Sequence, residues 1–341
     1  MDKIFKDKHI AIIGGAGFIG HHMALRYCEL GAEVSIIDGL QVNNLLSFSN
    51  SHNTISNRDF YVGFINERLE LMRKKHIAMY IQDVRDYHAT SHLLDRIQPN
   101  VIIHLAAVSH ADRSNKDPYS TFDHSLRTLE NTLDYARYHV NTGLEHYIYF
   151  SSSMVYGHFS SGTVTEDTIC EPLGIYGALK YAGEKLVISY NQVFELPYTI
   201  IRPSALYGER CVSRRVAQIF VENALQNKPI TVSGDGGDRV DFTYIEDLVQ
   251  GVEKVISSEA SKNQIFNLTY GQSRSIGELA EIVKDYFPDS QVVYQPKDNL
   301  TPDRGTLSVE KAQALIGYKP TFSLENGMKK YIQWYRSLKD F

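Results

Sequence analysis

The chain has 341 residues, of which 43% are hydrophobic and 22% are charged. This composition is sufficient for one large or two moderate hydrophobic cores, and it excludes a disordered chain or a small disulfide-rich domain. The 35 basic and 40 acidic residues give a net charge of −5, which argues against a nucleic-acid partner.

Short apolar segments rich in β-branched residues alternate with helical stretches over about the first 200 residues. Near-continuous apolarity is typical of parallel strands that are covered on both faces. Helical spacing of Phe122, Leu126, Leu129 and Leu133 predicts a helix between the fourth and fifth strands. The alternation predicts an α/β fold with a doubly wound parallel sheet of the Rossmann type. The predicted strands are residues 9–15, 33–38, 77–83, 101–107, 146–151 and 198–202.

The connection between the second and third predicted strands is longer than a usual crossover. It runs from Asp38 to Ile77 and contains a polar stretch rich in Asn and Ser at 43–57, followed by a predicted helix around 67–75. Two interpretations remain open from the sequence. The segment is either an excursion on the surface or a flap over a bound cofactor.

After Pro203 the alternation becomes less regular. We expect residues 1–203 to form the Rossmann domain and residues 204–341 to form mainly a smaller, mixed α/β lobe. A segment near 241–271 is expected to return to the large sheet. The predicted elements are helices at 214–227, 275–286, 309–315 and 324–338, a strand end passing into a helix at 241–256, and a strand at 264–269.

The sequence carries no indication of a membrane, secretory or metal-binding protein. It has no run of 18 apolar residues, and its charged N-terminal segment lacks the apolar stretch of a signal peptide. Cys28, Cys170 and Cys211 are odd in number and far apart, as fits a reducing compartment. The 13 histidines show no metal-ligand spacing. We therefore expect a cytoplasmic protein without a metal ion.

A glycine-rich loop follows the first predicted strand, and a helix follows the loop. Gly14, Gly17 and Gly20 are spaced for a sharp turn, a close approach to a pyrophosphate and packing of the helix on the strand. The helix N-terminus then offers free amides to the phosphates. Asp38 ends the second strand 18 residues beyond Gly20, where an acid accepts hydrogen bonds from an adenosine ribose and repels a 2′-phosphate. The pattern predicts that the loop binds NAD and not NADP.

A tyrosine and a lysine predict the reaction chemistry. Tyr176 and Lys180 are four residues apart, so a helix would place them on one face. Tyrosine has a reference pKa of about 10, and a nearby lysine together with a positive nicotinamide ring would favour its phenolate. The run Ser151-Ser152-Ser153-Met154-Val155-Tyr156-Gly157 leaves the fifth predicted strand at its carboxyl end, where sites in such folds are built. Tyr176 is therefore predicted to be a general base with a serine hydroxyl beside it.

These motifs, with Asp83-Val84 and His104-Leu105-Ala106-Ala107, resemble the extended short-chain dehydrogenases/reductases. The narrower resemblance, over almost the whole chain, is to the NAD-dependent nucleotide-sugar epimerases and dehydratases. It implies that Tyr176 is the base, that Lys180 supports it and binds the nicotinamide ribose, and that Ser152 is the hydroxyl partner. The implied NAD-binding residues are Gly14, Gly17, Phe18, Ile19, Gly20, Asp38, Asp83, Val84, Leu105, Ala106, Ala107, Tyr176 and Lys180.

The resemblance also implies a nucleotide-diphosphate sugar as substrate. Arg304 matches a family arginine that contacts the nucleotide, whereas Arg239 lies one residue before the position of another and Val240 occupies that position. Ala205 stands where the family often has an asparagine. The implied substrate-binding residues are Ser109, His110, Ser152, Ser153, Arg214, Arg215, Arg239 and Arg304. For Arg214 and Arg215 a solvated helix start is the alternative interpretation.

Two positions in the serine run bear on the reaction. Family 4,6-dehydratases carry acidic residues just before Val-Tyr-Gly, where this chain has Ser153 and Met154, and methionine cannot exchange a proton. A 4-epimerase needs no such acid, because the 4-keto sugar only turns in the site and accepts the hydride on its other face. We therefore favour an NAD-dependent nucleotide-sugar 4-epimerase similar to UDP-glucose 4-epimerase.

Several alternatives to this assignment remain. A nucleotide-sugar dehydrogenase or reductase with exchangeable cofactor is one, and a 4,6-dehydratase with unusual acids is another, since residues 109–114 resemble the dehydratases. A sensor that binds NAD without turnover is a third. The resemblance further implies a homodimer formed by the helix at 122–133 and the helix that carries Tyr176.

Overall fold

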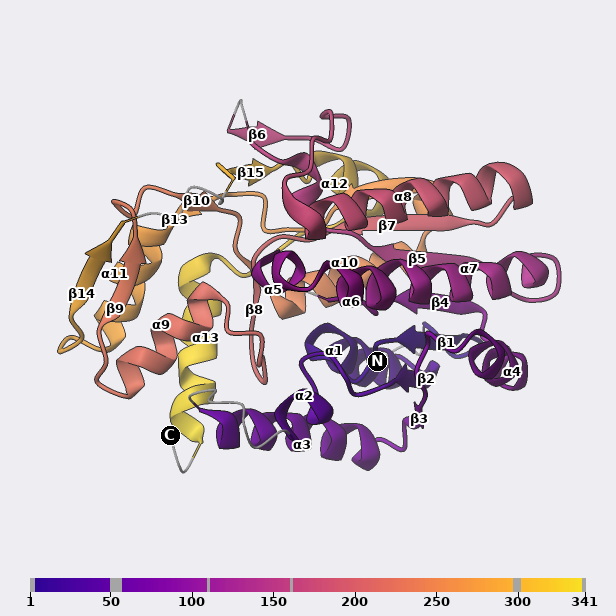
Figure 1. The fold of residues 1–341 in the computed structure, drawn as a ribbon, viewed down its shortest axis with the longest axis horizontal. Helices are drawn as coiled ribbons and strands as arrows, with labels where there is room; N and C mark the ends of the chain where they lie inside the picture. Colours follow the sequence, from indigo (N-terminus) through magenta and orange to yellow (C-terminus); the bar gives the residue numbers. More distant parts are fainter. Residues whose placement is uncertain (1–3, 50–56, 109–110, 160–161, 297–301, 339–341) are drawn as a thin grey trace.

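The centre of the molecule is a seven-stranded sheet. The computed structural model describes residues 4–49, 57–108, 111–159, 162–296 and 302–338, and its large sheet has the strand order β12-β7-β5-β4-β1-β2-β3 (Figure 1). Every neighbouring pair in this sheet is parallel. Because the strand order reverses between β1 and β4, the predicted doubly wound sheet is confirmed. The strands are β1 (His9–Ile13), β2 (Glu33–Asp38), β3 (Ala78–Ile81), β4 (Val101–His104), β5 (His146–Phe150), β7 (Tyr198–Arg202) and β12 (Gln264–Asn267).

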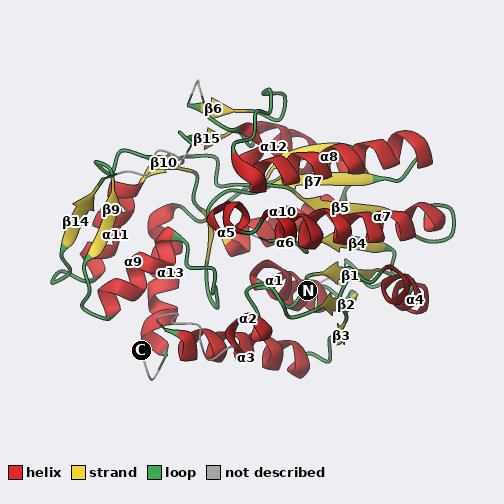
Figure 2. Ribbon diagram, in the orientation of Figure 1, coloured by secondary structure: helices red, strands yellow, loops and turns green. Residues whose placement is uncertain are grey.

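Helices cover both faces of this sheet (Figure 2). Ile10 and Ile12 of β1 pack in one core, with α1 (Phe18–Glu29) and α10 (Ile245–Ser257). The alternate residues Ala11 and Ile13 pack in the other core. Burial on both faces explains why successive strand positions are apolar and why the strands are readable in the sequence. The second core includes α4 (Tyr87–Ile97), α7 (Thr128–His139) and α8 (Gly174–Phe194).

Short elements connect these layers. Three of them lie between β4 and α7, and a fourth follows β5. They are α5 (Ala111–Lys116), α6 (Pro118–Phe122), the π-helical turn η1 (Asp123–Arg127) and the 3₁₀ turn η2 (Ser153–Tyr156). Helix α12 (Glu310–Ile316) lies beside β12 and contacts η3 (Glu259–Ser261). Since β12 pairs with β7, part of the C-terminal third lies at the edge of the large sheet.

The C-terminal part of the chain also builds a smaller lobe beside the sheet (Figure 1). Its two longest strands, β9 (Ile230–Ser233) and β14 (Val292–Gln295), pair in parallel. The sequence predicted the helices of this lobe but missed both strands, because they are only partly buried and carry no extended apolar run. The helices are α9 (Val216–Leu225), α11 (Ile276–Tyr286) and α13 (Leu324–Ser337). Two-residue pairs join β8 (Leu206–Tyr207) to β11 (Thr243–Tyr244), β10 (Arg239–Val240) to β13 (Arg274–Ser275), and β6 (Thr163–Val164) to β15 (Thr306–Leu307).

The long connection between β2 and β3 forms α2 (Leu45–Ser49) and α3 (Arg58–Lys74). Helix α3 is longer than the predicted helix around 67–75, and it extends from the sheet towards α13 (Figure 1). The hydroxyl of Tyr61 donates to Glu222 Oε2 at 2.6 Å, and the ring of Phe64 lies 4.9 Å from that of Trp334. These contacts fix the outer part of the excursion against the smaller lobe.

Two findings concern the described part of the chain as a whole. None of its helices combines the length and the apolarity needed to cross a membrane. Its His, Cys, Asp and Glu side chains form no group of three or more that could hold a metal ion.

Candidate active site

The glycine loop brings the start of α1 against the end of β4. Gly14 has φ +77°, and a Cβ on it would lie 2.9 Å from the backbone nitrogen of Ala106. A Cβ on Gly20 would lie 2.5 Å from Cα of Gly15, so the helix start packs directly on the turn. By contrast, a Cβ on Gly17 would approach only the Gly14 carbonyl oxygen, at 3.3 Å. Gly17 therefore faces open space at the N-terminus of α1, where a phosphate would approach.

This difference predicts separate outcomes for two alanine substitutions. We expect Gly20→Ala to lower the free energy of unfolding by about 1–3 kcal/mol, because the methyl group has no room. Gly17→Ala should fold normally but lower the affinity for NAD at least about tenfold, because the methyl group occupies the phosphate approach. Thermal unfolding and calorimetric titration with NAD measure the two effects. Equal losses of stability in both variants would contradict the assignment of Gly17.

The carboxylate of Asp38 is fixed at the end of β2. Its Oδ2 accepts a hydrogen bond from the Ala16 amide at 3.0 Å, and its Oδ1 accepts from the Leu40 amide at 2.7 Å. Burial raises the pKa of this carboxyl, while the two backbone hydrogen bonds lower it. The glycine loop and the strand end are thus joined by one acid, which is placed for the predicted contact with an adenosine ribose.

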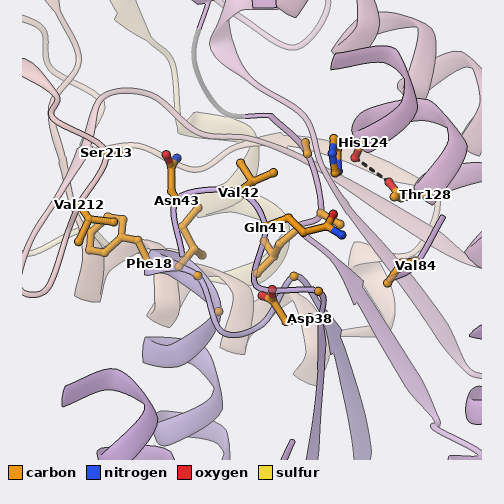
Figure 3. Close-up of a pocket in the computed structure, with 18 of the residues that line it drawn as sticks. Phe18, Asp38, Gln41, Val42, Asn43, Val84, His124, Thr128, Val212 and Ser213 are labelled. Carbon is orange, nitrogen blue, oxygen red and sulfur yellow. Dashed lines mark hydrogen bonds between the residues drawn. The ribbon is translucent and has the colours of Figure 1, made fainter. Parts of the chain in front are cut away.

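One pocket gathers the predicted cofactor residues (Figure 3). Eleven of the thirteen line it, namely Gly14, Gly17, Phe18, Ile19, Gly20, Asp38, Asp83, Val84, Leu105, Ala106 and Ala107. The other two, Tyr176 and Lys180, do not line this pocket. The sequence motifs do not include a further set of lining residues, namely Gly39, Gln41, Val42, Asn43, Arg68, His124, Thr128, Leu206, Val212 and Ser213.

Most of the missed residues belong to two segments outside the recognised motifs. The loop after β2 contributes Gln41, whose side chain donates to Asp83 Oδ2 at 2.9 Å. Asp83 also pairs with Arg85, and this guanidinium holds the pKa of Asp83 well below its usual range. The loop after β8 contributes Val212 and Ser213 (Figure 3). The start of the long excursion therefore does lie over the pocket, whereas its outer part lies against the smaller lobe.

The tyrosine and lysine lie on the first turns of α8. A Cβ on Gly177 would lie 2.7 Å from the Met154 carbonyl oxygen, so the start of α8 packs directly on η2. This close approach places half-buried Tyr176 beside the serine run. Lys180 is buried, and its Nζ donates to the Phe150 carbonyl at 2.6 Å. Burial lowers the pKa of Lys180 to about 8, although the charge of Glu184 opposes the shift.

The three serines after β5 have different partners. Ser151 faces the core, and its hydroxyl donates to Glu184 Oε1 at 2.5 Å. Ser152 caps η2, since its Oγ accepts from the Met154 amide at 3.2 Å. Ser153 Oγ accepts from Arg304 Nη2 at 2.7 Å. Among the described residues, the predicted catalytic Ser152 is therefore the serine of the run that bonds a local backbone amide and not a distant side chain.

Arg304 connects the smaller lobe to the reaction centre. The same Nη2 also donates to Ser204 Oγ at 2.8 Å. Burial lowers the pKa of Arg304 to about 10 and Arg215 acts in the same direction, whereas the charges of Asp241 and Tyr176 oppose it. Arg304 thus lies within electrostatic range of the predicted base and of a second arginine. Two arginines near a predicted sugar site suit a diphosphate.

The arrangement predicts a binding defect when Arg304 is replaced. We expect Arg304→Met to raise KM for the nucleotide sugar about 10- to 100-fold, because one charge-assisted contact is lost. Steady-state kinetics should give a smaller rise for Arg239→Met, because the Arg239 side chain is about half exposed and does not line the pocket. A fall in kcat with unchanged KM would instead assign Arg304 to the chemical step.

The structure separates the other predicted substrate residues. Arg215 lines the pocket, whereas Arg214 is exposed and absent from the lining. Arg239 lies on β10 and bonds Ser273 Oγ at 3.1 Å. Ser109 and His110 lie outside the described residues.

The pocket fits the two halves of a dinucleotide. Gly17 leaves space at the α1 N-terminus for a diphosphate, and the Asp38 carboxylate lies at the β2 end for a ribose. Ala106 and Ala107 line the pocket with small side chains. The residues present therefore fit NAD.

Known proteins resemble the chain over nearly its whole length. An uncharacterized UDP-glucose epimerase of Bacillus subtilis, YtcB, is 29% identical over 96% of this chain and 98% of that protein. The crystal structure of Thermotoga maritima UDP-glucose 4-epimerase with UDP-glucose superposes with a TM-score of 0.80 at 25% identity, covering 96% of this chain and 98% of that one. The complex of Bacillus cereus UDP-glucuronic acid 4-epimerase with UDP-glucuronic acid and NAD has a TM-score of 0.82 at 24% identity, covering 96% and 99%, and shows the same fold.

The family is established by a sequence profile. The profile described as the NAD dependent epimerase/dehydratase family matches residues 10–269, which include the glycine loop, the serine run and Tyr176. This range covers most of the 341 residues. The chain belongs to the NAD dependent epimerase/dehydratase family, and NAD is its cofactor.

Proposed function

We propose that the protein is an NAD-dependent 4-epimerase of a nucleotide-diphosphate sugar, acting through a transient 4-keto sugar. The observation that carries this proposal is the identity of the first two residues of η2, Ser153 and Met154. A serine bound by Arg304 and a methionine occupy the two positions where elimination needs acids. Tyr176 and Lys180 nevertheless remain on adjacent turns of α8 beside the serine run.

The residues of the chain have distinct roles in this proposal. Tyr176 takes the proton of the sugar 4-hydroxyl, and Ser152 binds the same oxygen. Lys180, one turn further along α8, supports Tyr176 and binds the nicotinamide ribose. Bound NAD supplies the acceptor for the C4 hydride and then the donor that returns it. After the keto sugar has turned, Tyr176 returns the proton to the oxygen, and the configuration at C4 is inverted.

Asp241 is a carboxyl near Arg304 that could be considered as a replacement acid for elimination. Burial raises its pKa to about 7. Its side chain is 0% exposed, however, and it accepts hydrogen bonds from Thr269, Gly271 and Leu307. A carboxyl committed to three donors inside the protein is poorly placed to reach a sugar. This arrangement favours epimerisation over 4,6-dehydration.

The relatives suggest where to look for the substrate. UDP appears in the names of YtcB and of both solved epimerases, so UDP-hexoses and UDP-hexuronic acids are the first candidates. We place NAD in the domain formed by residues 1–203 and the sugar nucleotide mainly against the lobe formed by residues 204–341. Arg304, which bonds Ser153, comes from that lobe and supports this division, although Arg215 of the same lobe lines the cofactor pocket.

We further propose a homodimer formed through α7 and α8. These neighbouring helices carry apolar side chains on their outer surface, and Tyr138 and Val193 are 62% and 69% exposed. Phe122, just before α7, is 48% exposed, whereas Leu129 and Leu133 are buried in the core. Light scattering during gel filtration tests this assembly, and a monomeric mass at micromolar concentration would contradict it.

Product analysis tests the proposed reaction. Purified protein is incubated with UDP-, GDP-, dTDP- and CDP-sugars without added cofactor, and the products are identified by proton NMR. The proposal expects catalytic formation of the C4-inverted sugar nucleotide. A 4-keto-6-deoxy product would indicate a dehydratase. Turnover that requires stoichiometric added NAD would indicate a dehydrogenase.

A further inference from the structure

Arg68 is a buried cation that neither the motifs nor the proposed reaction explains. It lies on α3, its side chain is 0% exposed, and it lines the cofactor pocket. Its Nε donates to the Arg210 carbonyl at 3.0 Å, and its Nη2 donates to the same oxygen. Its Nη1 is buried and has no hydrogen-bond partner among the described residues. The guanidinium is therefore fixed on one side and unsatisfied on the other.

A chain of contacts places this guanidinium beside the start of α1. Arg210 Nε donates to His21 Nε2 at 3.0 Å, so His21 carries its proton on Nδ1 and donates from there to the Gly17 carbonyl at 3.0 Å. Gly17 is the N-cap of α1. Arg68 thus lies near the helix end that offers its amides to a phosphate.

The charges near Arg68 are largely engaged with other groups. The carboxylate of Asp38 accepts two backbone amides, and Glu67 pairs with the guanidinium of Arg210. No ion pair joins Arg68 to Asp38 among the described residues, although each affects the pKa of the other. An unpaired buried charge is costly, and an unsatisfied buried donor needs a partner. In a pocket that binds NAD, the diphosphate is the ligand group of opposite charge.

We propose that Arg68 binds the diphosphate of NAD through Nη1. The two hydrogen bonds to the Arg210 carbonyl hold the guanidinium in place before the cofactor arrives, so little side-chain freedom is lost on binding. Arg210 belongs to the loop after β8 that also places Val212 and Ser213 in the pocket. Arg68 therefore connects three parts around the cofactor: α3, this loop and the start of α1. Such a contact favours a cofactor that stays bound between turnovers.

Binding measurements without a sugar test this contact separately from the epimerase reaction. NAD-free protein is titrated with ADP-ribose, which contains the diphosphate, and with adenosine, which lacks it, by calorimetry or by competition. For Arg68→Met we expect the affinity for ADP-ribose to fall about 10- to 100-fold, while adenosine binding changes less than about threefold. Equal weakening of both ligands would mean that Arg68 only supports the fold of the pocket. Unchanged binding of ADP-ribose would also overturn the proposal.

A neighbouring substitution controls for disturbance of the loop. Glu67 accepts from Arg210 Nη1 at 3.2 Å but does not line the pocket. Glu67→Gln therefore weakens the Arg210 contact and leaves the Arg68 guanidinium intact. We expect it to preserve the affinity for ADP-ribose. A loss as large as that of Arg68→Met would assign the effect to the loop and contradict a direct contact.

The unmodified protein gives a test that needs no variant to fold. In a crystal structure with NAD, Arg68 Nη1 is expected within about 3.2 Å of a diphosphate oxygen. A guanidinium turned onto the Asp38 carboxylate, or bonded to an adenosine ribose hydroxyl, would contradict the proposal.

Discussion

Tyr176→Phe is expected to lower kcat about 1,000-fold, because a phenyl ring cannot accept the proton of the sugar hydroxyl. The phenol lies on the first turn of α8, one turn before Lys180, and is half-buried beside η2. Removing one oxygen leaves the close packing of Gly177 on Met154 unchanged. Steady-state kinetics with the identified sugar nucleotide measure the loss. NAD released by denaturation and quantified by absorbance measures retention, which should equal that of the unmodified protein.

A second tyrosine on the same helix provides the control. Tyr181→Phe also removes one hydroxyl from α8, but Tyr181 packs in a separate small core with Val155, Phe159 and Leu307. We expect this variant to retain most of its activity. If Tyr176→Phe kept more than a third of the activity, or lost activity and NAD in parallel, Tyr176 would not be the base.

The second large effect concerns a buried ion pair beneath the site. Arg202 donates from Nε to Glu184 Oε1 at 2.9 Å and from Nη2 to Oε2 at 2.7 Å, and the two side chains are 3% and 1% exposed. Glu184→Ala would leave the guanidinium buried without its main partner and Ser151 without its acceptor. We expect the free energy of unfolding to fall by about 3–5 kcal/mol. Urea unfolding followed by circular dichroism measures it.

An exposed glutamate serves as the matched control for this substitution. Glu281 lies on α11 and faces solvent, so Glu281→Ala should change the free energy of unfolding by less than about 0.5 kcal/mol. A similarly small change in Glu184→Ala would mean that the buried pair contributes no net stability. In that case Arg202 would have to find other partners, such as the hydroxyl of Tyr156 that it already contacts.

The parts of the fold that the sequence predicts are those with a repeated pattern. All six predicted strands of the large sheet are present. Five of them are largely buried, and burial on both faces leaves an apolar run in each, whereas β3 lies at the sheet edge and is partly exposed. The strand at 264–269 also forms, as β12 at the sheet edge. β9 and β14 were missed because they are only partly buried, so neither carries an extended apolar run, and they pair only with one another. Such a pairing depends on contacts between residues about 60 positions apart, which no local pattern records.

The residues of the candidate site also fall into two groups, those that a local sequence pattern predicts and those that it does not. Residues of the glycine loop, the strand ends and the serine run are predictable, because fixed spacing within one segment carries their chemistry. Arg68 could not be found in this way, since its place in the pocket depends on α3 packing against the loop that holds Arg210. The contact between Arg304 and Ser153 joins residues 151 positions apart. Geometry of this kind arises only when the two lobes are folded together.

The central claim is that a hydride leaves C4 of the sugar and returns to the same carbon. A sugar nucleotide carrying deuterium at C4 tests it most directly, with the product in ordinary water analysed by NMR and mass spectrometry. The account predicts a C4-inverted product that keeps its deuterium at C4. Deuterium at C6 of a 4-keto-6-deoxy sugar, or in a released reduced nicotinamide with an oxidised sugar, would contradict it.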